Sequence, residues 1–370
     1  MGGGFVSLKD YEGEIYTCLR CGFCQAGCPT FRHTLNESLN ARGRVILAKL
    51  YLTGQYTPDE DYMQRVLSCT LCDICKVKCP PKVEVAEIVE ALRSELWRSH
   101  RDLYPQDIVE SINSILERQN PFGVPREQKM RSYEGESSVL FFVGCSSSVY
   151  YPHMAENTLQ VLRALGLNPT VLGQEEPCCG YRLVEMGAVD EFKRVASEVV
   201  SFLENRGVEL VITNCPTCYK TLKEYYKRYT SLTFEVMHIT EWLVKEAKFE
   251  GELSEPMTVT YHDPCHLGRS MGVYEEPRQL LESIRNLKFV ELPKSREESI
   301  CCGGPIRALY PELASKMSDE VVQGAIEVGA SQIVSSCTTC YRSIASSAAF
   351  HAEVDALDLP TLLARALRRG

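Results

Sequence analysis

The sequence predicts an α/β fold that follows an α-helical N-terminal domain, and three observations lead to this fold class. Ten cysteines between residues 145 and 340 fall into two matching sets, which indicates a duplicated unit. Short apolar segments come directly before cysteines of both sets, and segments with apolar residues at helical spacing come after these cysteines. This alternation of strands and helices is typical of parallel α/β sheets. The first 100 residues carry a different cysteine pattern and are assigned to a separate, helical domain.

The N-terminal domain, residues 1–100, is built around two cysteine runs with the same spacing, each followed by a proline. The runs are "CLRCGFCQAGCP", with Cys18, Cys21, Cys24 and Cys28, and "CTLCDICKVKCPP", with Cys69, Cys72, Cys75 and Cys79. Cysteines three apart form disulfides only in special turns, whereas thiolates select zinc or iron–sulfur clusters. C-x2-C-x2-C-x3-C-P is an iron–sulfur spacing, and its recurrence 51 residues later predicts two 4Fe–4S cubanes rather than two zinc sites.

These runs resemble those of two-cluster ferredoxins, in which the fourth cysteine of each run serves the other cluster. A short loop can wrap three corners of a cube, and the fourth ligand then comes from elsewhere. The resemblance implies one cubane on Cys18, Cys21, Cys24 and Cys79, and another on Cys69, Cys72, Cys75 and Cys28. "SLNARGRVILAKLYL" supplies a helix in the spacer, so a helical two-cluster ferredoxin domain is expected.

Residues 101–136 are predicted to form a helical linker. This segment has no cysteine, and we expect one or two helices in it together with the loop "QNPFGVPREQ".

Two related α/β domains, residues 137–256 and 257–370, are predicted from the ten remaining cysteines. Each set has a single cysteine, then Cys-Cys-Gly, then C-x2-C, with an offset of about 120 residues between the sets. The sets are Cys145, Cys178, Cys179, Cys215 and Cys218, and Cys265, Cys301, Cys302, Cys337 and Cys340. The segments "SSVLFFVGC", "VELVITNC", "MTVTYHDPC" and "ASQIVSSC" each run a strand into a cysteine. Because reactive groups gather beyond the carboxyl ends of parallel strands, two pseudo-symmetric, Rossmann-like domains are expected to face each other through their cysteines.

Five thiols per set exceed what a cubane or a zinc ion needs, since each takes four ligands. The fifth cysteine therefore idles, reacts, or bridges in a cluster that is not a cube. Ligand chemistry alone leaves these alternatives open, including a zinc or cubane site with a spare cysteine. Gly180 and Gly303, which follow the paired cysteines, are expected to let the backbone approach the sulfurs.

Together these patterns closely resemble the D subunit of the heterodisulfide reductases, a family that includes its split counterparts, the B and C subunits. The stretches "TVTYHDPCHLGRSMGVYEEPR" and "VLFFVGCSSSVYY" carry the resemblance, which extends from about residue 12 to 368. It implies that each five-cysteine (CCG) set holds a non-cubane 4Fe–4S cluster and that a disulfide is cleaved between the two clusters. Iron–sulfur subunits of glycolate and lactate oxidases and of anaerobic glycerol-3-phosphate dehydrogenase look similar.

The resemblance implies an iron–sulfur oxidoreductase that passes electrons through two cubanes to two CCG clusters. These clusters would reduce a small-molecule disulfide, such as that of coenzyme M and coenzyme B (CoM-S-S-CoB), to two thiols. The alternative is an electron-transfer subunit of a flavin-linked 2-hydroxyacid or glycerol-3-phosphate dehydrogenase, or of a larger flavin-based complex. Oxidase-type subunits often lack a cysteine in one or both sets, and both sets are complete here, which favours disulfide chemistry. The expected partners are other oxidoreductase subunits, either a flavoprotein or a cytochrome b-type membrane subunit.

Polar residues around Cys265 are candidates for a role beyond cluster binding. "YHDPCHLGR" places His262 and His266 on either side of Cys265, with Asp263 and Arg269 nearby. The histidines are candidate catalytic groups, as a proton donor or an anion clamp. The favoured alternative is that these residues cap the helix and hydrogen-bond to cluster sulfurs. The aromatic residues at 149–151 and 224–226 are expected to pack between helices rather than to line a channel.

Composition and charge argue against several other classes. Hydrophobic and charged contents of 44% and 24% are ordinary for a globular protein, and a net charge of -9 disfavours nucleic acid as a partner. No basic region followed by an apolar one opens the chain, so no signal peptide is expected, and the apolar runs are too short for direct membrane insertion. Eighteen cysteines at cluster spacing imply a reducing cytoplasm, with any membrane association through a partner subunit. No G-x-G-x-x-G or P-loop follows a strand, so no flavin or nucleotide is expected in this chain.

Overall fold

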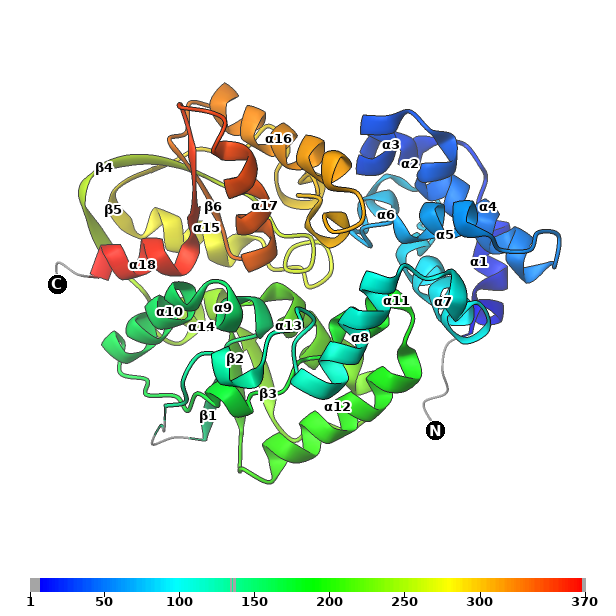
Figure 1. The fold of residues 1–370 in the computed structure, drawn as a ribbon. Helices are drawn as coiled ribbons and strands as arrows, with labels where there is room; N and C mark the ends of the chain where they lie inside the picture. The colour runs from blue at the N-terminus through cyan, green and yellow to red at the C-terminus, as the bar shows by residue number, and fades with distance from the viewer. Residues whose placement is uncertain (1–6, 134, 136–137, 368–370) are drawn as a thin grey trace.

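A computed structural model describes residues 7–133, 135 and 138–367, and three bodies are visible in it (Figure 1). A helical N-terminal domain (blue to cyan) lies beside two α/β units, one mainly green and the other yellow to red, which face each other. Both units have parallel sheets, so the predicted α/β class with a helical N-terminal region is confirmed. The expectation that the chain has no signal peptide rests on its N-terminal stretch, and residues 1–6 of that stretch lie outside the described residues. Within the described residues, no helix has the length and apolar character needed to cross a bilayer.

Short helices and tight loops hold the two cysteine runs of the N-terminal domain. The helices are α1 (Glu12–Thr17), α2 (Phe23–Gly27), α3 (Pro29–Thr34), α4 (Ala41–Leu52), α5 (Glu60–Leu67), α6 (Ile74–Lys78) and α7 (Val85–Ser99). Each run bends at equivalent positions, because the second and fourth residues after its first cysteine have left-handed backbone angles. These residues are Arg20 (φ 56°), Gly22 (φ 86°), Leu71 (φ 52°) and Asp73 (φ 60°). These bends turn the chain sharply between the first three cysteines of each run. The helix predicted in the spacer is α4.

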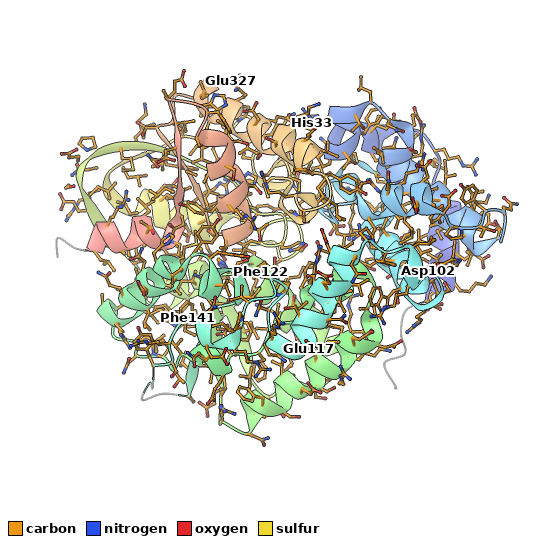
Figure 2. The ribbon with its side chains drawn as sticks, viewed as in Figure 1. His33, Asp102, Glu117, Phe122, Phe141 and Glu327 are labelled. Carbon is orange, nitrogen blue, oxygen red and sulfur yellow. The ribbon has the colours of Figure 1, made fainter. Side chains whose placement is uncertain are left out.

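The linker contains one long helix, α8 (Gln106–Arg118), followed by the predicted loop. Asn120 fixes this loop, because its side-chain N–H donates to the carbonyl oxygen of Val124 over 2.7 Å and its side-chain oxygen accepts from the N–H of Phe122 over 3.0 Å. Phe122 lies near the middle of the view, where the two α/β units face each other (Figure 2). The linker therefore contributes a side chain to the space between the units. The domain boundaries proposed from the sequence stay predictions.

The first α/β unit has a three-stranded parallel sheet in the order β1-β2-β3. Its strands are β1 (Val139–Phe142), β2 (Leu210–Thr213) and β3 (Glu235–His238), and its helices are α9 (Cys145–Val149), α10 (Pro152–Ala164), α11 (Tyr181–Met186), α12 (Val189–Glu204), α13 (Pro216–Lys220) and α14 (Ile239–Lys245). The strands predicted before Cys145 and Cys215 are the neighbours β1 and β2. Their carboxyl ends therefore bring these cysteines to the same edge of the sheet.

The second α/β unit has a four-stranded parallel sheet in the order β5-β4-β6-β7. Its strands are β4 (Gly251–Tyr261), β5 (Ile284–Phe289), β6 (Gln332–Ser335) and β7 (Asp355–Asp358), and its helices are α15 (Glu275–Glu282), α16 (Pro311–Glu327), α17 (Thr338–Ala348) and α18 (Leu359–Leu367). The strands predicted before Cys265 and Cys337 are β4 and β6, again neighbours. The two units thus repeat the same placement of cysteines, whereas a Rossmann-like topology in detail stays a prediction.

Polar contacts join the three bodies. The side chain of Asn157 on α10 donates to Thr361 Oγ1 on α18 over 2.8 Å, which links the two α/β units. On α3 of the N-terminal domain, Arg32 pairs with Glu320 of α16, and His33 Nε2 lies 3.2 Å from the other carboxylate oxygen of Glu320. The N-terminal domain is therefore held against the second α/β unit along α3 and α16.

Arg93 of α7 joins the second cysteine run to the first α/β unit. Its side chain is fully buried and donates to the carbonyl oxygens of Val66, Leu67 and Cys69 at 2.9, 3.1 and 2.7 Å. It also donates to the carbonyl oxygen of Glu185 on α11 at 2.7 Å. One guanidinium thereby satisfies four buried acceptors from two bodies.

Arg93→Met is expected to lower the free energy of unfolding by about 3 kcal/mol or more, because it leaves buried carbonyl oxygens without donors. Urea denaturation of the anaerobically purified protein, followed by circular dichroism, measures the change. The matched control is Arg98→Met on the same helix, which removes an exposed ion pair to Asp190 and should cost less than about 1 kcal/mol. Equal losses in the two variants would contradict the role given to Arg93.

Candidate functional site

The structure brings Cys28 of the first run to the cysteines of the second run. Cys28, Cys69, Cys72 and Cys75 line the same small cavity. Cys28 reaches this place because it follows α2 and precedes Pro29, the first residue of α3. This position of Cys28 beside the second run is compatible with the crossed pairing, in which Cys28 and the first three cysteines of the second run bind one cluster.

The other N-terminal cysteines lie nearer to solvent. Burial, and after it the neighbouring thiols of Cys28, Cys18 and Cys79, raises the pKa of Cys24 to about 11. Cys21 is exposed. Cys79, the last cysteine of the second run, is thus close to the first run.

A buried cation makes the cavity around Cys28 suitable for an anionic iron–sulfur group. Arg44 is 1% exposed, and its Nη1 lies 3.9 Å from Cys28 Sγ. Its Nη2 donates to Ser68 Oγ at 2.8 Å and to Thr30 Oγ1 at 3.2 Å, and no carboxylate of the described chain forms an ion pair with it. Because a buried unpaired charge is costly, Arg44 fits a site in which ligating thiolates carry negative charge.

The five cysteines of the first α/β unit come from three places at one end of its sheet. Cys145 begins α9 after β1, Cys178 and Cys179 precede α11, and Cys215 and Cys218 lie at the start of α13 after β2. The sulfurs of Cys179 and Cys218 are 3.6 Å apart. The thiols are so close that ionising several of them without a cation would be unfavourable, and this donor set fits a soft metal centre.

The glycines beside the paired cysteines allow tight turns that pack against neighbouring helices. Gly180 (φ 78°) and Gly303 (φ 75°) adopt left-handed backbone angles, but a Cβ on them would meet helices rather than sulfur. A side chain at Gly180 would lie 3.1 Å from the Phe192 ring, and one at Gly303 would lie 2.7 Å from Ala314 Cα. Gly144 is the glycine that faces a thiol, since its Cβ would lie 3.1 Å from Cys218 Sγ. The predicted approach of the backbone to sulfur is confirmed at Gly180, whose N–H donates to Cys178 Sγ over 3.5 Å, and at Gly303 it stays a prediction.

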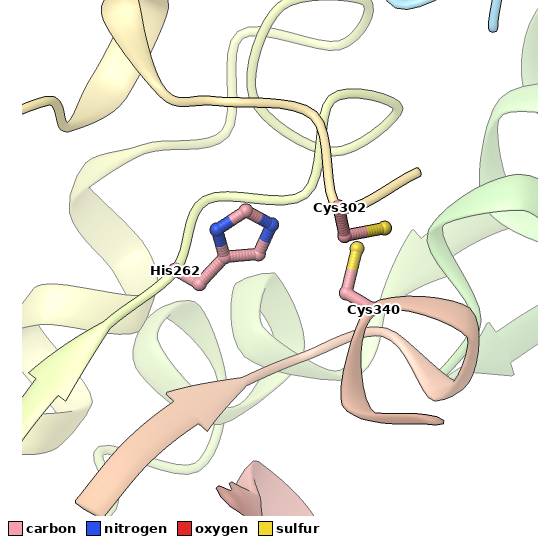
Figure 3. A group of neighbouring side chains, drawn as sticks. All are labelled: His262, Cys302 and Cys340. Atoms are coloured by element: carbon pink, nitrogen blue, oxygen red, sulfur yellow. The ribbon is translucent and has the colours of Figure 1, made fainter. Parts of the chain in front are cut away.

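His262 adds an imidazole to the second five-cysteine set. It directly follows β4, and its ring faces the thiols of Cys302 and Cys340, which come from a loop and from α17 (Figure 3). Ligand atoms of the three buried residues lie within 4.8 Å of one another. These three residues could therefore hold a metal ion through one nitrogen and two sulfurs. The other three cysteines of the set could supply further ligands. The equivalent position in the first unit is Phe142, so this imidazole is present in only one unit.

His266 connects the two units. It is buried, and its Nε2 lies 3.2 Å from Tyr181 Oη while its Nδ1 lies 3.0 Å from Thr217 Oγ1. Both partners belong to the first unit and flank its cysteines. Burial lowers the pKa of His266 well below its ordinary value, so the ring is neutral and hydrogen-bonded on both sides.

Asp263 and Arg269, the other candidates near Cys265, make structural contacts. Asp263 forms a bidentate pair with Arg278 at 2.8 and 2.9 Å. Arg269 donates from Nε to the carbonyl oxygen of Cys72 at 2.6 Å and from Nη1 to that of Ser299 at 2.6 Å. Arg269 therefore ties the second cysteine run to the second unit.

A cavity of about 450 Å³ lies between the two α/β units, and cysteines of both sets line it. Its walls also include Phe122 of the linker loop and both Tyr150 and Tyr151. The expectation that the tyrosines at 149–151 only pack between helices was wrong, whereas Tyr225 and Tyr226 are buried against Phe192 as expected.

Cys301 is the member of the second set that does not line this cavity. Its thiol instead lies close to that of Cys72, and both residues belong to one buried cluster with Ile306. The second N-terminal run and the second five-cysteine set are therefore in direct contact.

Comparison with known families matches both parts of the chain. The 4Fe–4S dicluster domain matches residues 14–83, and the cysteine-rich domain (CCG) matches residues 139–223 and 259–345. The chain is 31% identical to the D subunit of dihydromethanophenazine:CoB–CoM heterodisulfide reductase of Methanosarcina acetivorans, with 96% of this chain and 94% of that protein covered. The chain belongs to the family of heterodisulfide reductase D subunits. The resemblance inferred from the sequence is confirmed, and this member of the family is an iron–sulfur oxidoreductase.

Relatives named for other functions are also similar to this member of the heterodisulfide reductase D family. A probable glycolate oxidase iron–sulfur subunit of Bacillus subtilis is 26% identical, with 89% of this chain and 88% of that protein covered. EtfAB:quinone oxidoreductase of Syntrophomonas wolfei is 26% identical over 86% of this chain and 52% of that protein. Several relatives are thus named as subunits of larger assemblies.

Sequence reasoning missed the arginines of this heterodisulfide reductase D family site. Arg44, Arg93 and Arg269 surround the second cysteine run, and only Arg269 had been noted, for its closeness to Cys265 in the sequence. Arg44 and Arg93 lie within helices that look ordinary in the sequence. Their burial without carboxylate partners is the signal, and it is visible only in the folded chain.

Proposed function

We propose that this chain is the catalytic, disulfide-reducing subunit of a heterodisulfide reductase-type complex. One observation carries the proposal: nine cysteines, drawn from both five-cysteine sets, line one cavity of about 450 Å³. Clusters held by the two sets would face each other across this space, and a disulfide bound between them would contact both sets at once.

The proposed ligands follow the grouping of the cysteines. The two cubanes would use Cys18, Cys21, Cys24 and Cys79, and Cys69, Cys72, Cys75 and Cys28, while the two non-cubane clusters would use Cys145, Cys178, Cys179, Cys215 and Cys218, and Cys265, Cys301, Cys302, Cys337 and Cys340. When bound, these groups would supply single electrons and Lewis-acidic iron.

The residues around the cavity would bind and orient the disulfide. Reduction breaks one S–S bond with two electrons, and two protons complete the two thiols. His266 holds the two units in a fixed relation through Tyr181 and Thr217, which would keep both five-cysteine sets against the same substrate. Phe122 and Tyr150, whose ring centroids are 4.7 Å apart, would cover the carbon chain of the substrate.

The contacts at the N-terminal domain support one direction of electron supply. The proximity of Cys72 to Cys301 favours delivery into the second five-cysteine set. In the first cysteine run, Cys21 is exposed beside Leu19 (71% exposed) and Phe23 (63% exposed). This apolar surface suits contact with an electron-donating subunit, either a flavoprotein or a cytochrome b-type membrane subunit.

The second candidate is an electron-transfer subunit beside a flavin-linked 2-hydroxyacid or glycerol-3-phosphate dehydrogenase, or in a larger flavin-based complex. The observation that favours it is the likeness to the probable glycolate oxidase iron–sulfur subunit over 89% of this chain.

Reduced viologen distinguishes the two candidates. The isolated, cluster-loaded chain should oxidise reduced viologen when CoM-S-S-CoB or a related asymmetric disulfide is added, and two thiols should form for each disulfide consumed. A relay subunit would be reduced by viologen but would turn over no disulfide. Loaded, viologen-reducible protein that reduces none of the disulfides offered would overturn the first proposal in favour of the second.

A further inference from the structure

Two arginines of the cavity between the α/β units carry charge without an acidic partner. Arg307 follows the Cys302-Gly303 turn, and Arg342 lies on α17 two residues after Cys340. Neither forms an ion pair with any carboxylate in the described part of the chain. A third arginine of the cavity, Arg182, differs because it pairs with Glu185 at 2.6 Å.

Arg307 is poorly satisfied by the protein. Its Nη2 donates to Ser318 Oγ at 3.2 Å and to the carbonyl oxygen of Ser343 at 3.4 Å, both long contacts. Its Nε is buried without a hydrogen-bond partner. Burial, opposed by the thiol of Cys302 and reinforced by the charge of Arg342, lowers the pKa of Arg307. The Arg307 guanidinium therefore has unused hydrogen-bond donors, and a bound anion would stabilise its charge.

Arg342 lines the same cavity as Arg307 but is more accessible to solvent. It is exposed, and its guanidinium carbon lies 5.7 Å from the centre of the Tyr150 ring, to which it offers a cation–π contact. Tyr151 is within electrostatic range of both Arg342 and Arg307. Aromatic side chains of the first unit and cationic side chains of the second unit therefore meet at one part of the cavity wall.

We propose that Arg307 and Arg342 together bind an anionic end group of the disulfide substrate. Arginine is suited to sulfonate, carboxylate and phosphate groups, because its planar donors can bind two oxygens at once. The inference rests on the proposed disulfide-reducing function and adds a property of the substrate. Because Arg307 and Arg342 follow Cys302 and Cys340, the half of the disulfide that carries the anion would lie against the second five-cysteine set.

A rival role for Arg307 is to balance the charge of a cluster held by Cys302. That role does not extend to Arg342, which is exposed and faces an aromatic ring. The two roles differ in what the variants should change: iron content and cluster spectra in one case, discrimination between anionic and neutral substrates in the other.

The experiment compares disulfides that differ only in their end groups. The probes are the symmetric disulfides of mercaptoethanesulfonate, mercaptopropionate and mercaptoethanol, and cystamine, each reduced with viologen by the loaded chain. We expect KM to be about tenfold to hundredfold lower for the sulfonate and carboxylate disulfides than for the neutral one, with cystamine the poorest. Arg342→Gln and Arg307→Gln should raise KM for the anionic disulfides by a similar factor and change KM for the neutral disulfide by less than about twofold.

Arg182→Gln is the matched control, because it removes a charge from the same cavity that Glu185 already neutralises. It should change KM for all four disulfides in parallel. Binding is also measured directly, by calorimetry with the non-reducible thioethers thiodiethanesulfonate and thiodiethanol. Wild-type protein should prefer the sulfonate, and Arg342→Gln should remove that preference. Arg342 is exposed, so its variant should fold even if Arg307→Gln does not.

Several outcomes would overturn the proposal. These are equal KM values for anionic and neutral disulfides in the wild type, parallel losses for all disulfides in Arg342→Gln, or an effect of Arg307→Gln confined to iron content and cluster spectra. If no disulfide is reduced, the proposed function fails, but selective binding of thiodiethanesulfonate that depends on Arg342 would still support the anion site. Absence of that binding would remove the anion site as well.

Discussion

Replacing Cys302 or Cys179 with alanine is expected to lower disulfide turnover by more than about a thousandfold. Both thiols are buried, and both line the cavity between the α/β units. Cys302 lies beside His262 and Cys340 in the second set, and Cys179 lies 3.6 Å from Cys218 in the first. Each is central to its set, so neither set should hold its cluster when the thiol is absent. If reduction needs both sets at one substrate, the loss of either should suffice.

The N-terminal clusters should survive these two substitutions, because their proposed ligands lie in a different domain. Two cubanes and two four-iron clusters correspond to about 16 iron atoms per chain, and each variant should retain about 12. Viologen-driven turnover, iron content and electron paramagnetic resonance are measured on the same anaerobic samples. Ser146→Ala is the control, since it alters the same cavity without removing a thiol. Wild-type turnover in either cysteine variant would show that its set is not needed for disulfide reduction. Wild-type protein with only about 8 iron atoms and one or two zinc ions would exclude the non-cubane clusters.

The sheets of the α/β units were predictable where a cysteine followed a strand. Strands β1, β2, β4 and β6 all end shortly before a cysteine, so the duplicated cysteine pattern made them visible in the sequence. Strands β3, β5 and β7 were not predicted, because no cysteine follows them directly. They lie at the edges of their sheets, where they complete the fold without contributing a thiol.

The cysteines of the candidate site could be grouped from spacing alone, but the contacts between groups could not. The contact between Cys72 and Cys301 depends on how the N-terminal domain packs against the second unit, and these residues are 229 positions apart. Arg307 and Arg342 lie in segments with no distinctive spacing. The fold brings both of them to the wall of one cavity, where Arg182 and Glu185 already pair with each other.

Cys28→Ser should remove the cluster associated with Cys69, Cys72 and Cys75, although Cys28 belongs to the other run. The reason is position: Cys28 is buried and lines one cavity with those three cysteines, beside Arg44. The hydroxyl of serine is a harder and weaker ligand for iron than a thiolate, so this cluster should be lost or become labile. Iron content should fall by about four atoms per chain.

Two further variants identify which cluster is lost. The electron paramagnetic resonance spectrum of reduced Cys28→Ser should match that of Cys69→Ser and differ from that of Cys18→Ser. Cys79→Ser is the reciprocal test, and its spectrum should match that of Cys18→Ser, because Cys79 lies near the first run. All four variants remove one thiol from the same domain, so a general loss of stability would affect them alike and would not produce two matching pairs. If Cys28→Ser matches Cys18→Ser instead, each run binds its own cluster and the crossed pairing is wrong.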